Sequence, residues 1–167
     1  NGKITHLKTL EKSIEVDAVI ASADYHHIEQ EVLEEKDRTY TEDYWNSRTL
    51  APSSLIFYLG VNKKLPSLEH HNLFFHSDFN KHAEEIYKSP SWPNDPLFYV
   101  CCPSKTDPSV APEGHENEFI LIPIAPELED TQNIRHEFFD KTIKRLESLT
   151  GETIREQLKG QPAFVLE

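Results

Sequence analysis

The chain has 167 residues, with 17 Lys or Arg against 29 Asp or Glu, and so carries a formal net charge of −12 at pH 7. This length allows one domain with a real hydrophobic core but not two large domains. The negative charge would repel phosphate backbones, so no nucleic-acid partner is expected. The two cysteines, Cys101 and Cys102, are adjacent and cannot form a spaced disulfide framework, which favours a reducing cytoplasm.

The two ends of the sequence look like those of an excised piece. No window reaches the roughly 18 consecutive apolar residues of a membrane span, and no signal-like apolar stretch opens the chain. The chain contains no methionine and begins with the turn-like Asn1-Gly2-Lys3. We therefore expect a fragment of a longer protein, with Leu166-Glu167 as either a cloning remnant or a native end.

The N-terminal part predicts two strands and a helix. Alternating and then continuous apolar residues indicate strands over Lys3–Leu10 and Lys12–Ser22. Asp24 can cap a helix from Tyr25 to about Lys36, with acidic residues on its solvent side. The residues expected on its buried side are Ile28, Val32 and Leu33.

Four further strands and two further helices are expected after the polar and aromatic stretch that ends at Pro52. The expected strands are Ser53–Val61, His70–His76, Leu97–Cys102 and Glu118–Ile124. The expected helices are Asp78–Lys88 and a long one capped by Asp130 or Thr131 that ends at Gly151. Glu152–Leu158 predicts a short helix, and Gln161–Glu167 has no assignment.

These elements predict an α+β fold, a largely antiparallel sheet with helices packed on one face. We expect Ser53–Val61 and His70–His76 to be neighbours, with the helix from Thr131 to Leu149 covering one face. Both faces of the sheet look apolar, because Ile56 and Tyr58 point away from the side that carries Leu55, Phe57, Leu59 and Val61. The second face must then meet another layer, a partner domain or an apolar ligand.

Several kinds of site are excluded by spacing. The five glycines allow neither a GxGxxG fingerprint nor a Walker A loop, so the chain has no pyrophosphate cradle of its own. No HExxH or CxxC pattern occurs, and His70 and His71 should point to opposite sides of a strand, so no metal site is expected. No partner base can be named for Cys101 or Cys102, which are expected to be buried thiols.

The order of short segments is more informative than any single residue. Val16–Glu29 (VDAVIASADYHHIE) looks like the segment of two-dinucleotide-fold flavoenzymes in which a strand ends in Ala-Asp beside the flavin. The later segments YTEDYW, APSSLIFYLG, HHNLFF, DPLFYV, SKTDPSVAPEG and FILIP follow in the same order as in the phytoene and carotenoid desaturases. The chain therefore resembles the central, substrate-domain portion of that family.

The resemblance implies an FAD-dependent oxidoreductase acting on a long polyene. It assigns 1–24 to the edge of the flavin domain, with Ala23 and Asp24 near the cofactor, and 25–165 to the substrate domain. The family's Gly-rich FAD motif has no match here, so the isolated chain is not expected to hold FAD tightly or to be active. The parent enzyme is expected in the cytoplasm, with peripheral membrane contact as one option, and its oligomeric state is not assigned.

An apolar polyene must be bound through buried apolar area, so an aromatic sheet face is a suitable wall. The candidate wall residues are Phe57, Tyr58, Phe74 and Phe75, for which plain core packing is the alternative. His70 and His71 are the candidate polar groups near the substrate, and no catalytic acid or base can be assigned. A carotenoid isomerase, an amine-oxidase-like flavoenzyme and a non-catalytic apolar-ligand module remain as alternatives.

Overall fold

The computed structural model describes residues 3–160 and 163–166. The chain divides into two compact units, Asn1–Thr49 and Leu50–Glu167, and each is described by itself. The boundary that the family resemblance implies after Asp24 separates parts of the parent enzyme, and it stays a prediction. No helix among the described residues has the length and apolar character needed to cross a bilayer.

The first unit contains less strand than expected. Strands β1 (His6–Lys8) and β2 (Ser13–Glu15) form a short antiparallel hairpin. The expected strand over Lys12–Ser22 is wrong beyond Glu15, since Val16–Ser22 pairs with no strand in the described part of the chain. The Val16 amide still donates to the Thr5 carbonyl at 3.0 Å, but the later residues of the run pair with no strand among the described residues, and Ile20 is almost fully exposed.

The helix expected from Tyr25 to Lys36 ends early. Asp24 caps α1 (Tyr25–His27), which continues into one π-helical turn (Ile28–Val32) before Leu33 becomes extended. Arg38 stabilises this break by donating hydrogen bonds to the backbone oxygens of Leu33 and Gln30, at 3.2 and 2.7 Å. A 3-10 turn (Glu35–Asp37) and helix α2 (Glu42–Asn46) follow.

The buried side of this helix carries a carboxylate. Val32, expected inside, is exposed, whereas Glu29 is fully buried. Its carboxylate accepts hydrogen bonds from the backbone amides of Thr39 and Tyr40, at 2.9 and 3.1 Å, and from the Tyr25 hydroxyl. Burial acts to raise the pKa of Glu29, but these hydrogen bonds outweigh it and lower the pKa. Glu29 departs from the expected acidic outer face because the loop amides need an acceptor, whereas Glu31 and Glu34 are exposed as expected.

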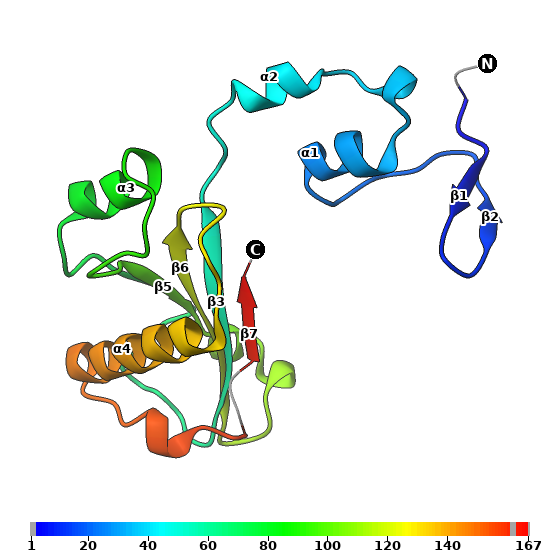
Figure 1. Ribbon diagram of the computed structural model, residues 1–167. Coiled ribbons are helices and arrows are strands. Elements are labelled where there is room, and N and C mark those ends of the chain that lie inside the picture. Colours follow the sequence, from blue (N-terminus) through cyan, green and yellow to red (C-terminus); the bar gives the residue numbers. More distant parts are fainter. Residues whose placement is uncertain (1–2, 161–162, 167) are drawn as a thin grey trace. The chain divides into compact units, whose positions relative to one another are not determined.

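The second unit is built on a five-stranded sheet, and its pairings are all antiparallel (Figure 1). The order in the sheet is β4-β5-β6-β3-β7. The strands are β3 (Ser53–Val61), β4 (His71–Phe74), β5 (Phe98–Cys101), β6 (Glu116–Ile124) and β7 (Ala163–Leu166). The α+β fold with a largely antiparallel sheet is confirmed.

Strand neighbours differ from the expectation. β3 lies between β6 and β7, and β4 pairs with β5, so the expected pairing of β3 with β4 is wrong. β7 comes from the C-terminal tail, which had no assignment, and Leu166 pairs with Leu55, whereas Glu167 lies outside the described residues. The short helix expected at Glu152–Leu158 is only a 3-10 turn (Arg155–Gln157).

Two helices complete this unit. Helix α3 (Phe79–Tyr87) begins after Asp78, whose carboxylate accepts from two backbone amides. Helix α4 (Gln132–Thr150) is capped by the Thr131 hydroxyl. It ends at Gly151, whose φ of 73° is easily adopted only without a side chain. Single 3-10 turns occur at Pro103–Lys105 and Pro108–Val110.

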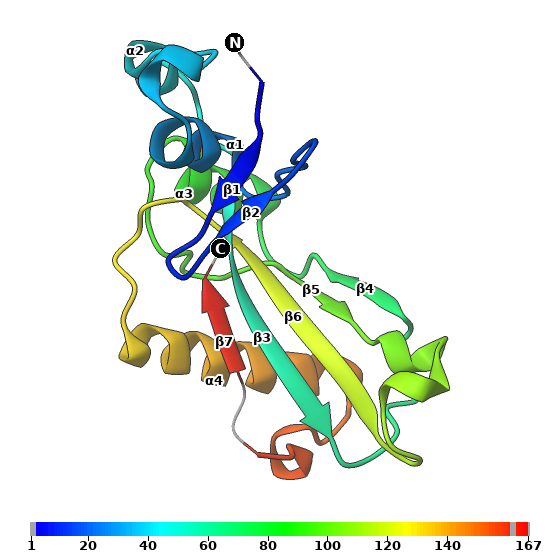
Figure 2. The same cartoon turned by 90° about the vertical axis from the view of Figure 1, so that its right-hand side faces the viewer.

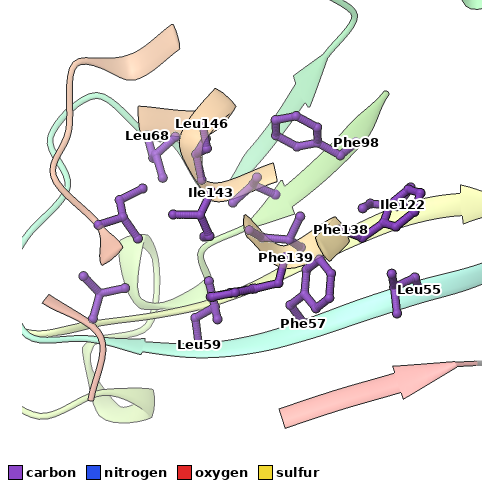
Figure 3. Packing of buried hydrophobic residues seen from close by; sticks show 14 of the residues in the cluster. Leu55, Phe57, Leu59, Leu68, Phe98, Ile122, Phe138, Phe139, Ile143 and Leu146 are labelled. Atoms are coloured by element: carbon purple, nitrogen blue, oxygen red, sulfur yellow. The ribbon is translucent and has the colours of Figure 1, made fainter. Parts of the chain in front are cut away.

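Helix α4 covers one face of the sheet, as predicted. Figure 3 shows Phe138, Phe139, Ile143 and Leu146 of α4 packed over Leu55, Phe57 and Leu59 of β3. Phe57 is fully buried, and its ring meets that of Phe139 edge to face at 5.4 Å. This interlocking of one helix stripe with one strand face forms the hydrophobic core.

Two buried carboxylates lie on the core side where β6 begins. Glu116 forms ion pairs with Lys64 and Lys105 at 3.4 and 3.3 Å and accepts a hydrogen bond from Ser104. Burial acts to raise its pKa, but these partners lower it. Neither carboxylate oxygen of Glu118 has a hydrogen-bond partner among the described residues. Burial, reinforced by the Glu116 charge, raises the pKa of Glu118 to about 7.

Glu118 should therefore make stability fall with rising pH. Between the ordinary pKa of 4.5 and about 7 the folded state holds this proton more tightly than the unfolded state, so the free energy of unfolding decreases across that window. The full effect is on the order of 3 kcal/mol, at about 1.4 kcal/mol per pH unit. Glu118→Gln should remove it. Urea unfolding between pH 4.5 and 8 measures the difference.

The exposed Glu113→Gln provides the control and should follow the parent chain. A Glu118→Gln variant with the same pH dependence as the parent chain would show that Glu118 is ionised in the folded state.

Candidate functional site on the open face of the sheet

The side chains of the central strands alternate between two environments. Along β3, Leu55, Phe57 and Leu59 face α4, whereas Tyr58 is 46% exposed. Along β6, Ile120 and Ile122 are fully buried, and Phe119 and Leu121 between them are only partly buried. Figure 2 shows the strands in front of α4, so the side chains of the second set project from the face away from that helix. We call this second surface the open face.

Antiparallel register arranges the open face in rows across four strands. Residues directly opposite each other project to the same side of a sheet. One row is Tyr58, Phe119, Cys101 and His71. The next row is Ile56, Leu121, Tyr99 and Leu73.

The rings and aliphatic side chains of these rows form a continuous apolar surface. The Phe119 ring lies 6.2 Å from that of Tyr58 and 5.7 Å from that of Tyr99, measured between centroids. On the outer strand of the sheet, Leu73 is 65% exposed. Leu73 and Tyr58 therefore keep much of their apolar area in water, whereas Ile56 and Cys101, in the same rows, are already buried.

The open face continues into an apolar hollow beside α3. Its volume is about 200 Å3, and His82 and Tyr87 are the lining residues whose side chains carry a polar group. The other residues that line it are Pro52, Phe75, Phe79, Ala83, Ile86, Leu97 and Pro123. Pro123 has the same position in the alternation of β6 as Leu121 and Phe119, so the hollow and the rows lie on one side of that strand.

His82 fixes helix α3 beside this hollow. Its Nε2 lies 2.8 Å from the backbone oxygen of Pro123, and its Nδ1 lies 3.2 Å from the backbone nitrogen of Leu97. The second contact requires Nδ1 to accept from the Leu97 amide, so Nε2 carries the proton and donates to Pro123. The imidazole is a structural bridge between α3 and two strands.

Polar groups gather at the β4 end of the first row. The Tyr99 hydroxyl lies 2.6 Å from Nδ1 of His71, and Cys101 Sγ lies 3.9 Å from the same nitrogen. Burial is the main cause that raises the pKa of Tyr99 to about 12, and contact with the Cys101 thiol adds to it. The Tyr99 phenol therefore stays neutral near neutral pH and serves as a hydrogen-bonding group.

The two neighbouring imidazoles do not diverge as expected. The rings of His70 and His71 have centroids 4.2 Å apart. Strand β4 begins at His71, so His70 precedes the region in which side chains alternate. The sequence argument applied the alternation rule one residue too early.

The structure separates the candidate wall residues into two groups. Phe57 packs in the core, and Phe74 stacks on the buried Phe98 at 4.8 Å between centroids. Tyr58 projects from the open face, and Phe75, 61% exposed, lines the hollow. His71 belongs to the open face as well, through its register with Cys101.

Four open-face residues were missed in the sequence. Tyr99, Phe119, Leu121 and Leu73 stand at alternate positions of their strands, and this alternation was available from the sequence. The sequence argument applied it to the runs Leu97–Cys102 and Phe119–Ile122 but named no wall residue there, because both runs are apolar at nearly every position. Ala23 and Asp24, the candidate flavin contacts, lie in the first unit, where the Asp24 carboxylate accepts from the His27 amide.

Comparison with known proteins gives a consistent set of relatives. The chain is 43% identical over 150 residues to a carotenoid 3,4-desaturase of Haloarcula japonica, covering 90% of this chain and 30% of the relative. It is 34% identical over 116 residues to a phytoene desaturase of Fusarium fujikuroi, covering 70% of this chain and 20% of the relative.

A third relative is a zeta-carotene-forming phytoene desaturase of Myxococcus xanthus, 32% identical over 132 residues, of which the chain spans 25%. No family model matches the chain. The chain thus spans less than a third of the length of each of these relatives.

Truncating a side chain should change the free energy of unfolding by different amounts on the two faces of β3. Phe57→Ala should lower the free energy of unfolding by about 3 to 5 kcal/mol, because it opens a cavity against α4. Tyr58→Ala should cost less than about 1.5 kcal/mol, because that ring is half exposed and leaves no closed cavity. Urea denaturation of both variants measures the contrast. Equal losses would mean that Tyr58 is part of a closed core.

Proposed function

Because this chain is a segment of the carotenoid and phytoene desaturase family, we propose that its open face forms a binding wall for a long apolar polyene in an FAD-dependent oxidoreductase. The observation that carries the proposal is the pair of apolar rows on the face of the sheet opposite α4. The names of the relatives supply the substrate class, carotenoids and their precursor.

A hydrocarbon polyene offers no polar handle, so its binding free energy must come from apolar area removed from water, at about 25 cal/mol per Å2. Tyr58, Phe119 and Leu73 present such area on strands held in fixed register. The hollow beside α3 extends the same wall. A rigid sheet can hold an extended chain in one orientation without hydrogen bonds to it, and it excludes water along its length.

In this proposal the chain contributes to the reaction by positioning the polyene. The neutral Tyr99 hydroxyl is hydrogen-bonded to His71 at the end of the first row, so these polar groups are paired with each other. FAD, when bound to the intact enzyme, supplies the oxidation chemistry. In the proposal the open face fixes which carbon of the polyene is presented, and no acid or base of this chain takes part.

The described residues do not fit a site for the whole of FAD. A dinucleotide pyrophosphate needs a glycine-rich turn at a helix N-terminus, and the five glycines include no such pattern. Asp24 uses its carboxylate to cap α1. We therefore assign the pyrophosphate contacts to the part of the relatives that this chain does not cover.

Isothermal titration of FAD into the purified chain tests that assignment. We expect no binding at micromolar concentrations, since a Kd of 1 μM requires about −8 kcal/mol, which contact without a pyrophosphate site is not expected to supply. Stoichiometric binding at or below about 1 μM would contradict it.

A polar side chain placed in the wall should disturb the substrate and spare the fold. We expect Leu73→Gln in the full-length enzyme to raise KM for the polyene about tenfold or to shift the product pattern, because the new amide must be desolvated, at about 1 to 3 kcal/mol. Product chromatography with phytoene as substrate, together with a melting curve, measures both effects.

The matched control is Leu149→Gln on α4. Leu149 is 48% exposed, but it lies on the helix that covers the opposite face. This variant should keep the parent's KM and product pattern. If Leu73→Gln also leaves both unchanged, the open face is not the polyene wall.

A further inference from the structure

We propose that His70, His71 and Cys101 form a binding site for Zn2+, or a cation of similar softness, at the β4–β5 end of the sheet. One donor atom from each of the three side chains lies within 4.8 Å of the other two. The inference rests on this cluster alone and does not depend on the proposed polyene wall.

The backbone brings the three residues together. His71 and Cys101 are direct partners in the antiparallel register, so their side chains leave the sheet on the same side. His70 is held beside them because its carbonyl accepts a hydrogen bond of 2.8 Å from the Cys102 amide. The cluster thus comes from two strands and the bend before one of them, and strand pairing keeps it assembled.

Hydroxyl groups orient both imidazoles. Nδ1 of His70 lies 2.7 Å from the Thr106 hydroxyl, and Nδ1 of His71 lies 2.6 Å from the Tyr99 hydroxyl. Hydrogen bonds of this kind around the donors of a metal site fix ring orientation and tautomer. These hydrogen bonds hold the two rings, one partly buried and one exposed, beside Cys101.

The donor distances are close to those of a bound site. Zn–N and Zn–S bonds of about 2.0 to 2.3 Å in a tetrahedron separate ligand atoms by about 3.3 to 3.8 Å. The donor atoms of the three side chains lie within 4.8 Å of one another, so they must approach by about 1 Å. Where Nδ1 of His71, 3.9 Å from Sγ of Cys101, is the donor, it binds the metal in place of its hydrogen bond to the Tyr99 hydroxyl, and rotation of the exposed His71 ring supplies the displacement.

The chemistry of the three donor atoms determines which ions can bind. One thiolate and two imidazoles suit Zn2+ and other borderline or soft ions, whereas Mg2+ and Ca2+ require oxygen ligands. The Cys101 thiol loses its proton to solvent when the metal–sulfur bond forms, so binding should weaken as the pH falls. Three protein donors leave one tetrahedral position for water or another ligand.

The adjacent cysteine offers a matched control. Cys102 is fully buried, and its Sγ lies 3.6 Å from the hydroxyl of Ser104, which donates to Glu116 on the core side of the sheet. Its place in the sequence differs by one residue, but its side chain does not belong to the cluster.

Titration of the purified chain with Co2+, followed by displacement with Zn2+, tests the site. We expect one Co2+ per chain with a thiolate-to-metal charge-transfer absorption, which Zn2+ abolishes. Cys101→Ser should remove this absorption and weaken Zn2+ binding by at least about tenfold, and His71→Ala and His70→Ala should each weaken it similarly. Cys102→Ser should bind as the parent does. Circular dichroism verifies that each variant is folded.

Two results would overturn the proposal. The first is the absence of a stoichiometric charge-transfer band in the folded parent chain. The second is a band that survives in Cys101→Ser or disappears in folded Cys102→Ser, because either outcome assigns the metal to other residues. If Cys102→Ser does not fold, Cys102→Ala is the replacement control, since it keeps the core apolar.

Discussion

The structure of the second unit depends on the antiparallel register of β3 and β6. These strands pair from Ser53 with Ile124 to Val61 with Glu116 without interruption, so every side chain is assigned to one of two faces. A shift by one residue would bring Tyr58 under α4 and expose Phe57. The packing of Phe57 against Phe139 opposes that shift, because the shift would expose apolar side chains that are now buried against α4.

The same register produces the open face. The sequence of β6 is apolar on both sides after Glu118, so packing one face against α4 leaves a second apolar face. In a domain whose only task was to fold, alternate polar residues would be expected there. The aromatic and aliphatic rows in their place are consistent with a surface that binds something apolar, as the proposed polyene wall requires.

Polar side chains lie near the ends of the apolar strands, on both sides of the sheet. At one end of β6 the carboxylates of Glu116 and Glu118 are buried on the core side, one paired with lysines and the other with its pKa raised. On the other side of the sheet, His71 and Cys101 meet at the end of a row. The lysine partners hold Glu116, and strand pairing holds His71 beside Cys101, whereas Glu118 has no hydrogen-bond partner among the described residues.

The sequence alone determined the features that depend on residues close together in the chain. The alternation in Ser53–Val61 predicted that strand and its two faces, and ordered motifs indicated the family. Asp130 or Thr131 was expected to begin α4 and Gly151 to end it, and the structure has Thr131 and Gly151 at these ends. Only the tertiary structure decided the strand order, the use of the tail as β7, the burial of Glu29 and the convergence of His70 with Cys101. These features arise from contacts between residues far apart in the chain or across a bend, and such contacts are set by which pairings bury the most apolar surface and satisfy the backbone.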